Sequence, residues 1–343
     1  MKNRLRFLLW GAALPALINS ACSCSTESAI QQILGIAAEP PVFIGCKAVS
    51  SREIAFQFSL PVTVTSLNFD PPQEIDEVRD GETVTVMLQD PPPGGERIMA
   101  DILVEDRDGN TLNVLVPFRT RNENFPSFII TEVRTEYSKP KVEFVELRML
   151  TAGNLGALRM FTAANGLDTP LFEFPPAAVS AGEYVVVHLR TLDPSLISET
   201  GGDTAAVPYT KENEAQPDAL DFWIPESKKR LSKKAGAVFF SDQDDRVIDA
   251  LIFGDFAADS WWQDEKTARA AELLGETGAW ISEDGGVPGP ADAVLSRNTT
   301  VTRSICRDET IADRDIAADW YIAATSCATP GKPNNPKRYV PAE

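Results

Sequence analysis

The side chains that most often do catalytic work are scarce in this chain. It has one histidine, His188, which falls inside the strand-like run 184–189. A Ser-His-Asp or Cys-His arrangement would have to use this histidine, and no serine or cysteine neighbours it in the run. The motifs G-x-S-x-G and H-E-x-x-H are absent, as are a glycine-rich phosphate loop and a Cys/His cluster for zinc. We therefore expect no enzyme, cofactor or metal site, although paired carboxylates among the many acids stay open.

The position of His188 in a strand leaves two placements for its side chain, because alternate residues of a strand face opposite sides. If Val185 and Val187 face the core, His188 faces outward. In the opposite phase His188 is buried and needs a hydrogen-bond partner. In both cases we expect a structural role.

One acidic turn has a spacing that could suggest calcium. It carries Asp106, Asp108 and Asn110. An EF-hand loop needs a glutamate at its twelfth position, which here is Pro117, so we reject calcium. We expect a turn held by the hydrogen bonds of its own side chains.

Aromatic and basic residues offer two further candidate contacts. Trp261 and Trp262 are adjacent and could stack on sugars, but paired tryptophans also attach an insertion to its domain. The run 228–230 is Lys-Lys-Arg. We expect these cations to lie on a solvent-exposed loop and to pair with nearby acidic side chains. The alternative is that they contact an anionic partner.

The first 21 residues have the order of a secretory signal peptide. Three cations precede an apolar run of about a dozen residues, which is too short to span a bilayer comfortably. Small residues then lead to Cys22, which is typical of lipid attachment, although Asn19 fills a position usually held by Leu. We expect a lipid anchor on Cys22, with Cys24 as a weaker candidate and plain secretion as the alternative. Residues 22–41 would then be a tether.

The remaining cysteines suggest a disulfide, because an exported compartment permits one. Cys306 and Cys327 lie 21 positions apart in one segment and are the pair we expect to be bridged. The sequence alone leaves the connectivity with Cys24 and Cys46 open, as it does the alternative of free buried thiols.

Charge and length set outer limits on function. The chain of 343 residues has a formal net charge of −18, which becomes more negative once the signal peptide is removed. The negative electrostatic field that results from this charge favours solubility and opposes nonspecific binding to nucleic acid or anionic lipid. The remaining length, about 320 residues, is enough for two domains with cores of their own.

Residues 42–121 predict a first β-domain. Ile54, Phe56 and Phe58 alternate with smaller or polar residues, and the run 83–88 has a clean period of two. The segments 54–62, 106–110 and 118–120 resemble, in order, the small bacterial Ig-like domains of surface proteins. This resemblance implies a β-sandwich, and residues 122–126 are expected to be a short linker.

Residues 127–335 predict a second β-domain. Strand patterns rich in Val, Ile, Phe and Tyr recur at 128–133, 142–147, 172–174, 184–189, 237–240 and 247–254. Insertions are expected at about 190–236 and 255–296, the second with a helix from Asp264 to Leu274 that Gly275 ends. Asp249, in the middle of a strand, must either point outward or accept hydrogen bonds from nearby backbone, and we expect the bond. Trp320 is expected in the core, and residues 336–343 form a tail.

The blocks I-I-x-E-V, E-F-V-E-L, F-x-F-P and A-G-E-Y-V-V-V resemble the start of bacterial lamin tail domains. The segment 247–254 and the closing pattern S-x-x-R, D-W, T-P-G-x-x-N agree in order, with Asp245 where that family usually has Gly. The resemblance implies an immunoglobulin-like β-sandwich that is usually a binding or scaffold module.

Together these patterns predict an all-β protein with two immunoglobulin-like β-sandwich domains in tandem, the second with loop and helical insertions. The expected function is that of a noncatalytic exported lipoprotein, anchored to a bacterial membrane through Cys22, in the periplasm or at the cell surface. It would serve adhesion, scaffolding or protein interaction, with an unknown protein or glycan partner. The alternatives are a carbohydrate-binding module that uses Trp261 and Trp262, or an accessory to an exported hydrolase.

Overall fold

The structure is a computed structural model that describes residues 39–200, 208, 210, 213–226, 228–255, 264–282 and 284–341. The predicted signal peptide, most of the tether, Cys22, Cys24, Trp261 and Trp262 lie outside these residues. Within the described ranges, no helix is both long and apolar enough to cross a bilayer. The chain is built almost wholly of β-strands, which confirms the predicted fold class.

Six strands between residues 43 and 119 form the first domain. They are β1 (Phe43–Ala48), β2 (Glu53–Asp70), β3 (Ile75–Arg79), β4 (Gly81–Leu88), β5 (Arg97–Asp106) and β6 (Thr111–Arg119). The long strand β2 pairs with β1 and β4 through its first half and with β5 through its second half, so a single hydrogen-bonded sheet folds around one core.

The core of the first domain follows directly from the period-two pattern. Ile54, Phe56 and Phe58 of β2 are buried, and so are alternate residues of β5 such as Ile98 and Ile102. Burial of one such side chain contributes about 1.5–3 kcal/mol. The β5–β6 turn is held as expected, because Asp106 accepts hydrogen bonds from the Asp108 and Asn110 backbone N–H groups at 2.8 and 2.9 Å.

The second domain is a sandwich of two sheets. The six-stranded sheet has the order β14-β13-β8-β7-β18-β19, and the five-stranded sheet has the order β11-β10-β15-β16-β17. The first sheet contains β7 (Phe128–Arg134), β8 (Phe144–Met149), β13 (Tyr184–His188), β14 (Ala219–Trp223), β18 (Ile305–Arg307) and β19 (Trp320–Ile322). The second contains β10 (Arg159–Thr162), β11 (Phe172–Glu173), β15 (Ala235–Ser241), β16 (Val247–Gly254) and β17 (Val294–Leu295). A small ladder joins β9 (Gly153–Asn154) to β12 (Ala178–Val179).

One continuous apolar core fills the space between these two sheets. It includes Val145 and Val187 from the first sheet, Phe240 and Leu251 from the second, and Trp320, as expected. The two sheets therefore stabilise each other as the layers of one domain.

The predicted insertions contribute more regular structure than the sequence indicated. β14 lies within the segment expected to be a loop, and it pairs in parallel with β13. β17 lies at the end of the second insertion and pairs in parallel with β16. Both strands follow long connections, which a parallel pairing requires. Short 3-10 helices occur at Ala163–Asn165, Pro290–Asp292 and Ala317–Asp319.

The predicted helix is present as α2 (Glu265–Glu276), and Asp264 caps its N-terminus. The expected stop at Gly275 is wrong, because the helix continues to Glu276. A Cβ atom added at Gly275 would lie only 2.4 Å from Cδ of Pro288. The lack of a side chain at Gly275 thus serves close packing against the following loop.

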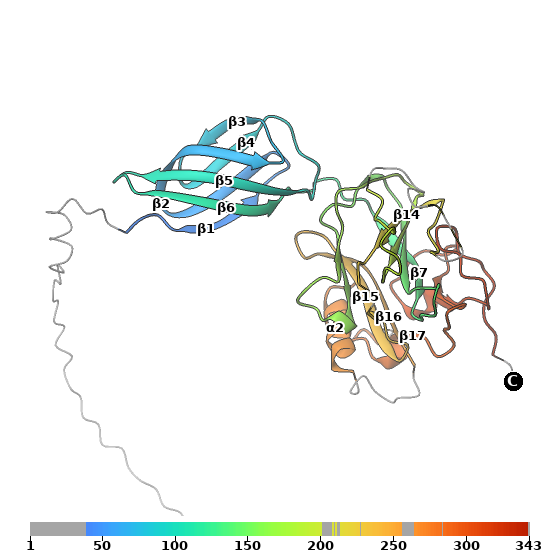
Figure 1. Cartoon of the computed structure of the whole chain (residues 1–343). Helices are drawn as coiled ribbons and strands as arrows, with labels where there is room; N and C mark the ends of the chain where they lie inside the picture. Colours follow the sequence, from blue (N-terminus) through green and yellow to red (C-terminus); the bar gives the residue numbers. More distant parts are fainter. Residues whose placement is uncertain are drawn as a thin grey trace, which may run out of the picture.

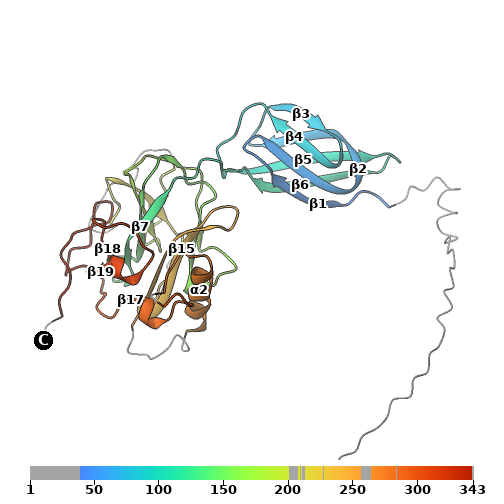
Figure 2. The same ribbon diagram turned by 180° about the vertical axis from the view of Figure 1, so that it is seen from behind.

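The two domains are arranged end to end (Figure 1; Figure 2 shows the same arrangement from behind). The strand β1, where the described chain begins, starts at one end of the first domain. The second domain is attached at the other end. The first domain therefore separates the start of β1 from the second domain.

Candidate functional site

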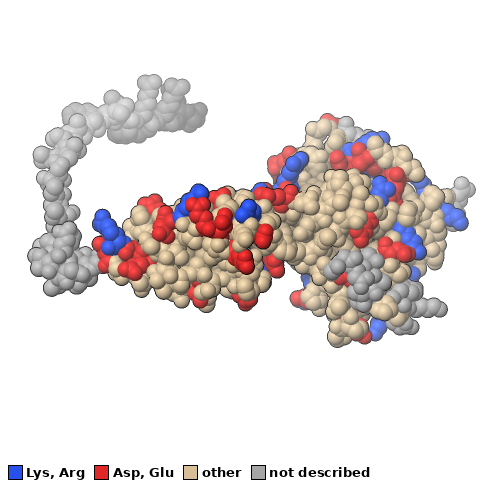
Figure 3. Space-filling view, turned by 90° about the horizontal axis from the view of Figure 1, so that it is seen from above, with Lys and Arg blue, Asp and Glu red and all other residues tan. Residues whose placement is uncertain are grey.

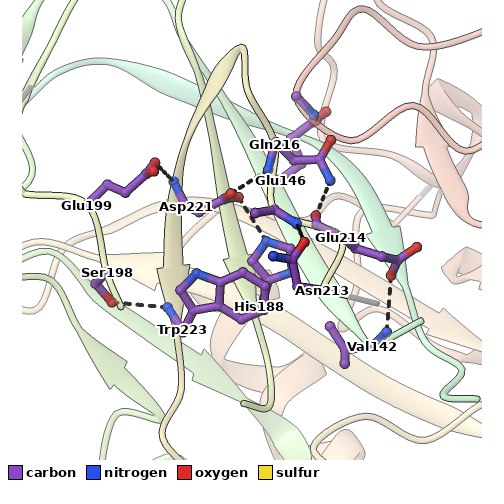
Figure 4. A network of polar contacts seen from close by, with 12 residues as sticks. Val142, Glu146, His188, Ser198, Glu199, Asn213, Glu214, Gln216, Asp221 and Trp223 are labelled. Carbon is purple, nitrogen blue, oxygen red and sulfur yellow. Dashed lines mark hydrogen bonds and ion pairs between the residues drawn. The ribbon is translucent and has the colours of Figure 1, made fainter. Parts of the chain in front are cut away.

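His188 is buried although Val185 and Val187 face the core, so the prediction that this phase would leave His188 facing outward is wrong. Both faces of β13 are covered, and all five of its residues are buried. Nε2 of His188 lies 2.8 Å from Oδ1 of Asp221, and the His188 ring stacks on Trp223 at 3.7 Å between ring centres (Figure 4). Asp221 also accepts the backbone N–H of Gln216. Nδ1 of His188 has no hydrogen-bond partner within the described part of the chain, so no relay to a nucleophile is formed there. The pair instead ties β13 to β14.

Asp249 accepts backbone hydrogen bonds, as its mid-strand position predicted. Its carboxylate accepts the N–H groups of Ile130 and Ala250, at 2.5 and 2.7 Å, and pairs with Arg307 at 3.0 Å. Burial raises the pKa of Asp249 to about 7, although Arg307 opposes the shift. These bonds connect the facing sheets through β16, β7 and β18.

Two more carboxylates, Asp313 and Asp315, come within 4.8 Å of Asp249. Arg307 also forms an ion pair with Asp313. Burial, followed by the nearby charge of Asp313, raises the pKa of Asp315 to about 6. The Arg307 guanidinium already lies between two of these carboxylates, Asp249 and Asp313, so we assign the group a structural role.

A second buried acidic pair, Glu132 and Glu146, holds the C-terminal segment. Glu132 accepts the N–H of Thr329 at 3.0 Å, and Glu146 accepts the N–H of Gly331 at 2.5 Å. Burial raises the pKa of both carboxyl groups. Both side chains are fully shielded from solvent, so they anchor the T-P-G segment rather than face a substrate.

The predicted Cys306–Cys327 bridge is not formed, because both cysteines are free thiols in the structure. Cys306 lies on β18 in a small apolar cluster with Tyr321 and Ala323, against which Cys327 packs. Burial raises the pKa of the Cys306 thiol well above its usual range, and Glu132 adds to the shift. Cys306 is therefore a neutral core residue.

The other sequence candidates are also structural. Glu226 pairs with Lys228 at 3.0 Å and with Arg230 at 2.9 Å. These ion pairs confirm that the basic run 228–230 pairs with a nearby acidic side chain. Trp280, close in sequence to the two tryptophans outside the described residues, is 1% exposed and donates its indole N–H to the carbonyl of Asp292.

The feature that the sequence did not reveal is the junction between the domains. Gly94, Gly95 and Gly156 meet at this junction, and a side chain on any of them would overlap atoms of the neighbouring segment. A Cβ on Gly95 would lie 2.2 Å from the carbonyl carbon of Gly156, and a Cβ on Gly156 would lie 1.9 Å from the carbonyl oxygen of Gly94. Such separations are far inside van der Waals contact, so the two backbones touch directly.

The segment expected to be a linker is a fixed part of this junction. Asn122 is 3% exposed and donates from Nδ2 to the carbonyls of Asn154 and Gly156, both at 2.8 Å. Its backbone exchanges two hydrogen bonds with the side chain of Gln243, at 3.0 and 2.8 Å. Buried hydrogen bonds of this kind fix an orientation, because breaking one leaves a buried polar group unpaired.

Two arginines add ion pairs across the same junction. Arg119 pairs with Glu173 at 2.5 Å, and Arg121 pairs with Asp244 at 2.6 Å through a two-point contact. Asp244 is half exposed, so its pair contributes little to stability but favours one orientation. The composition of the run Pro-Pro-Pro-Gly-Gly at 91–95 is typical of a loop and does not indicate these contacts, because the contact partners lie about 60 residues away in sequence.

Comparison with known proteins places the second domain in a family. The family model described as "TP_1001_2nd: protein second domain" matches residues 126–322, more than half of the chain. The chain belongs to this family. A curated relative from Treponema pallidum (strain Nichols), which carries the name "Uncharacterized protein", is 26% identical over 249 residues. These cover 71% of this chain and 62% of that protein, so the chain spans less than two thirds of its relative.

Among solved structures, the N-terminal part of the bacterial S-layer protein SbsC aligns with 66% of this chain and 46% of its own. The sequence identity is 11% and the TM-score is 0.25. The family boundary at residue 126 lies directly after the Asn122 segment, so the junction joins the family domain to the first sandwich.

Proposed function

We propose that the protein is a noncatalytic exported lipoprotein that displays its second domain at a fixed distance and angle from a bacterial membrane. The observation that carries this proposal is the interlocked junction at Gly94, Gly95, Gly156 and Asn122. A fixed joint is what a scaffold or adhesion module needs, because a flexible linker would let the domains reorient freely.

The arrangement of the chain supports this proposal. The first described strand, β1, begins at one end of the first domain, and the second domain is attached at the other end (Figure 1). A lipid on Cys22 would therefore place the first domain as a spacer. The strongly unusual groups of the second domain, His188, Asp249 and Glu132, are all used in internal bonds.

The surface fits a protein or glycan partner better than a nucleic acid. The formal charge is −18, and the face in Figure 3 shows acidic groups over both domains with basic groups scattered among them. A nucleic-acid interface would need a continuous basic patch to neutralise phosphates.

The anchor can be tested by metabolic labelling with a fatty acid in the native host. We expect label on the wild-type protein and on a Cys24→Ser variant, but none on a Cys22→Ser variant, which should move from the membrane to the soluble fraction. Equal labelling of the wild type and Cys22→Ser would contradict membrane display through this residue.

A further inference from the structure

A cleft of about 550 Å³ lies beside the junction. Its lining comes from both domains: the end of β1 at 46–48 and residues 117–121 in the first, and segments around Arg159, Glu173 and Asp244 in the second. Pockets between domains with volumes of about 300–1,000 Å³ are common sites for small ligands. This cleft therefore has the location and size of a binding site.

The charge of the lining is opposite to that of the whole molecule. The cleft has four cations, Lys47, Arg119, Arg121 and Arg159, against three carboxylates. The complete chain has 50 acidic and 32 basic residues. Cys46 adds no charge, because burial raises the pKa of its thiol to about 12. A local excess of positive charge in an acidic protein favours an anionic ligand.

Two of the three arginines, Arg119 and Arg159, are held in place by backbone carbonyls that an anion would not displace. Arg119 donates to the carbonyl of Gly95 at 2.9 Å, and Arg159 donates to the carbonyl of Asp242. The Nε atom of Arg159 is buried and has no hydrogen-bond partner among the described residues. The guanidinium groups are thus oriented in advance, which lowers the entropic cost of binding.

The acids that face these arginines are the replaceable part. The side chains of Asp244 and Asp245 are 52% and 83% exposed, so their pairs with Arg121 and Arg159 lie in solvent and contribute little energy. The pKa of Asp244 is lowered mainly by the hydrogen bond from Arg121, with smaller effects from Lys47 and Arg159. Arg121 thus holds an exposed carboxylate through a two-point contact, and Arg159 pairs with another exposed carboxylate beside it. A ligand oxyanion could take the place of either carboxylate.

We propose that this interdomain cleft binds a small ligand that carries at least two oxyanion groups, carboxylate or phosphate. Arginine forks bind such groups through two parallel hydrogen bonds, and Lys47 supplies a point charge at the rim. The ligand would contact both domains at once and would add to the contacts that fix the junction.

The test is calorimetric titration of the full-length protein with citrate and, separately, with inorganic pyrophosphate. We expect saturable binding of at least one of them, weakened by salt because the cleft is open. Substitution Lys47→Gln removes an exposed cation that takes no part in the junction, and should weaken binding about tenfold, the effect of one charged contact. The matched control is Lys332→Gln, which removes an exposed cation outside the cleft and should leave affinity unchanged.

The preferred probe tells the two chemistries apart: tighter binding of citrate points to a carboxylate ligand, and tighter binding of pyrophosphate to a phosphate ligand. Absence of binding by both probes would overturn the proposal. Equal affinities of the wild type and Lys47→Gln would do so too, because binding would then lie elsewhere.

Discussion

At the scale of single residues, the unusual side chains of the second domain act as internal ties. The sequence predicted a bond for Asp249, which the structure confirms. It predicted burial of His188 only if Val185 and Val187 faced away from the core, and this is wrong because both faces of β13 are covered. The partner Asp221 could not be predicted, because it lies on a strand that the sequence pattern did not reveal. Asp245 takes a left-handed conformation with φ of 65°, a region that favours glycine but that Asp adopts more readily than most residues.

His188→Gln tests the structural role of the histidine. Glutamine keeps a group that can bond to Asp221 but loses the stack on Trp223, so we expect a loss of about 1–2 kcal/mol in the free energy of unfolding. Chemical denaturation measures this loss. If the variant instead lost a hydrolytic activity of the wild type while its stability stayed unchanged, the noncatalytic account would fail.

Asp249 should make stability depend on pH. Its pKa is raised in the folded state from 3.8 to about 7, so the folded protein holds this proton more tightly than the unfolded chain does. The associated stabilisation is fully present below the unfolded pKa of about 4 and is lost as pH rises through about 7, on the order of a few kcal/mol.

Denaturant unfolding at pH 5 and pH 8 checks this dependence. We expect Asp249→Asn, which cannot ionise, to show a smaller loss of stability between the two pH values than the wild type. If the free energy of unfolding fell equally between pH 5 and pH 8 in both proteins, the pH dependence would belong to other groups, such as Asp315 or the pair Glu132 and Glu146.

At the scale of elements, period-two patterns were sufficient for the strands with one polar face, such as β2 and β5. They were insufficient for β14, whose five residues are all buried and therefore show no alternation. The helix α2 was predicted from its composition, but its end was not. Composition marks Gly275 as a stop, whereas its contact with Pro288 is visible only in three dimensions.

Gly275→Ala separates these two interpretations of the helix. Helix propensity alone predicts a gain of about 1 kcal/mol. Because the added Cβ would lie 2.4 Å from Cδ of Pro288, we expect a loss of about 1–3 kcal/mol instead, as in other overpacked sites. The control is Glu272→Ala on the same helix, which should change stability little. Thermal unfolding monitored by circular dichroism gives both values, and a stabilised Gly275→Ala variant would show that the contact is not close.

At the scale of the whole molecule, the sequence predicted two sandwiches but not how they are joined. Composition marks 91–95 and 122–126 as loop and linker, because glycine, proline and asparagine are typical of both. The same residue types also allow backbones to touch and carbonyls to be bridged. Only the fold brings Gly95 against Gly156 and Asn122 against Asn154.

The most direct test of the account is the rotational correlation time of each domain, from nitrogen-15 relaxation of the deuterated protein without its signal peptide. We predict one common correlation time for both domains of the wild type. Gly156→Ala, whose Cβ would lie 1.9 Å from the carbonyl oxygen of Gly94, should split it into two shorter values while both domains stay folded. Gly45→Ala, at a position with nothing within 4 Å of the added Cβ, should behave as the wild type. Two distinct correlation times in the wild type itself would contradict a fixed junction and, with it, the proposed display of the second domain at a set angle.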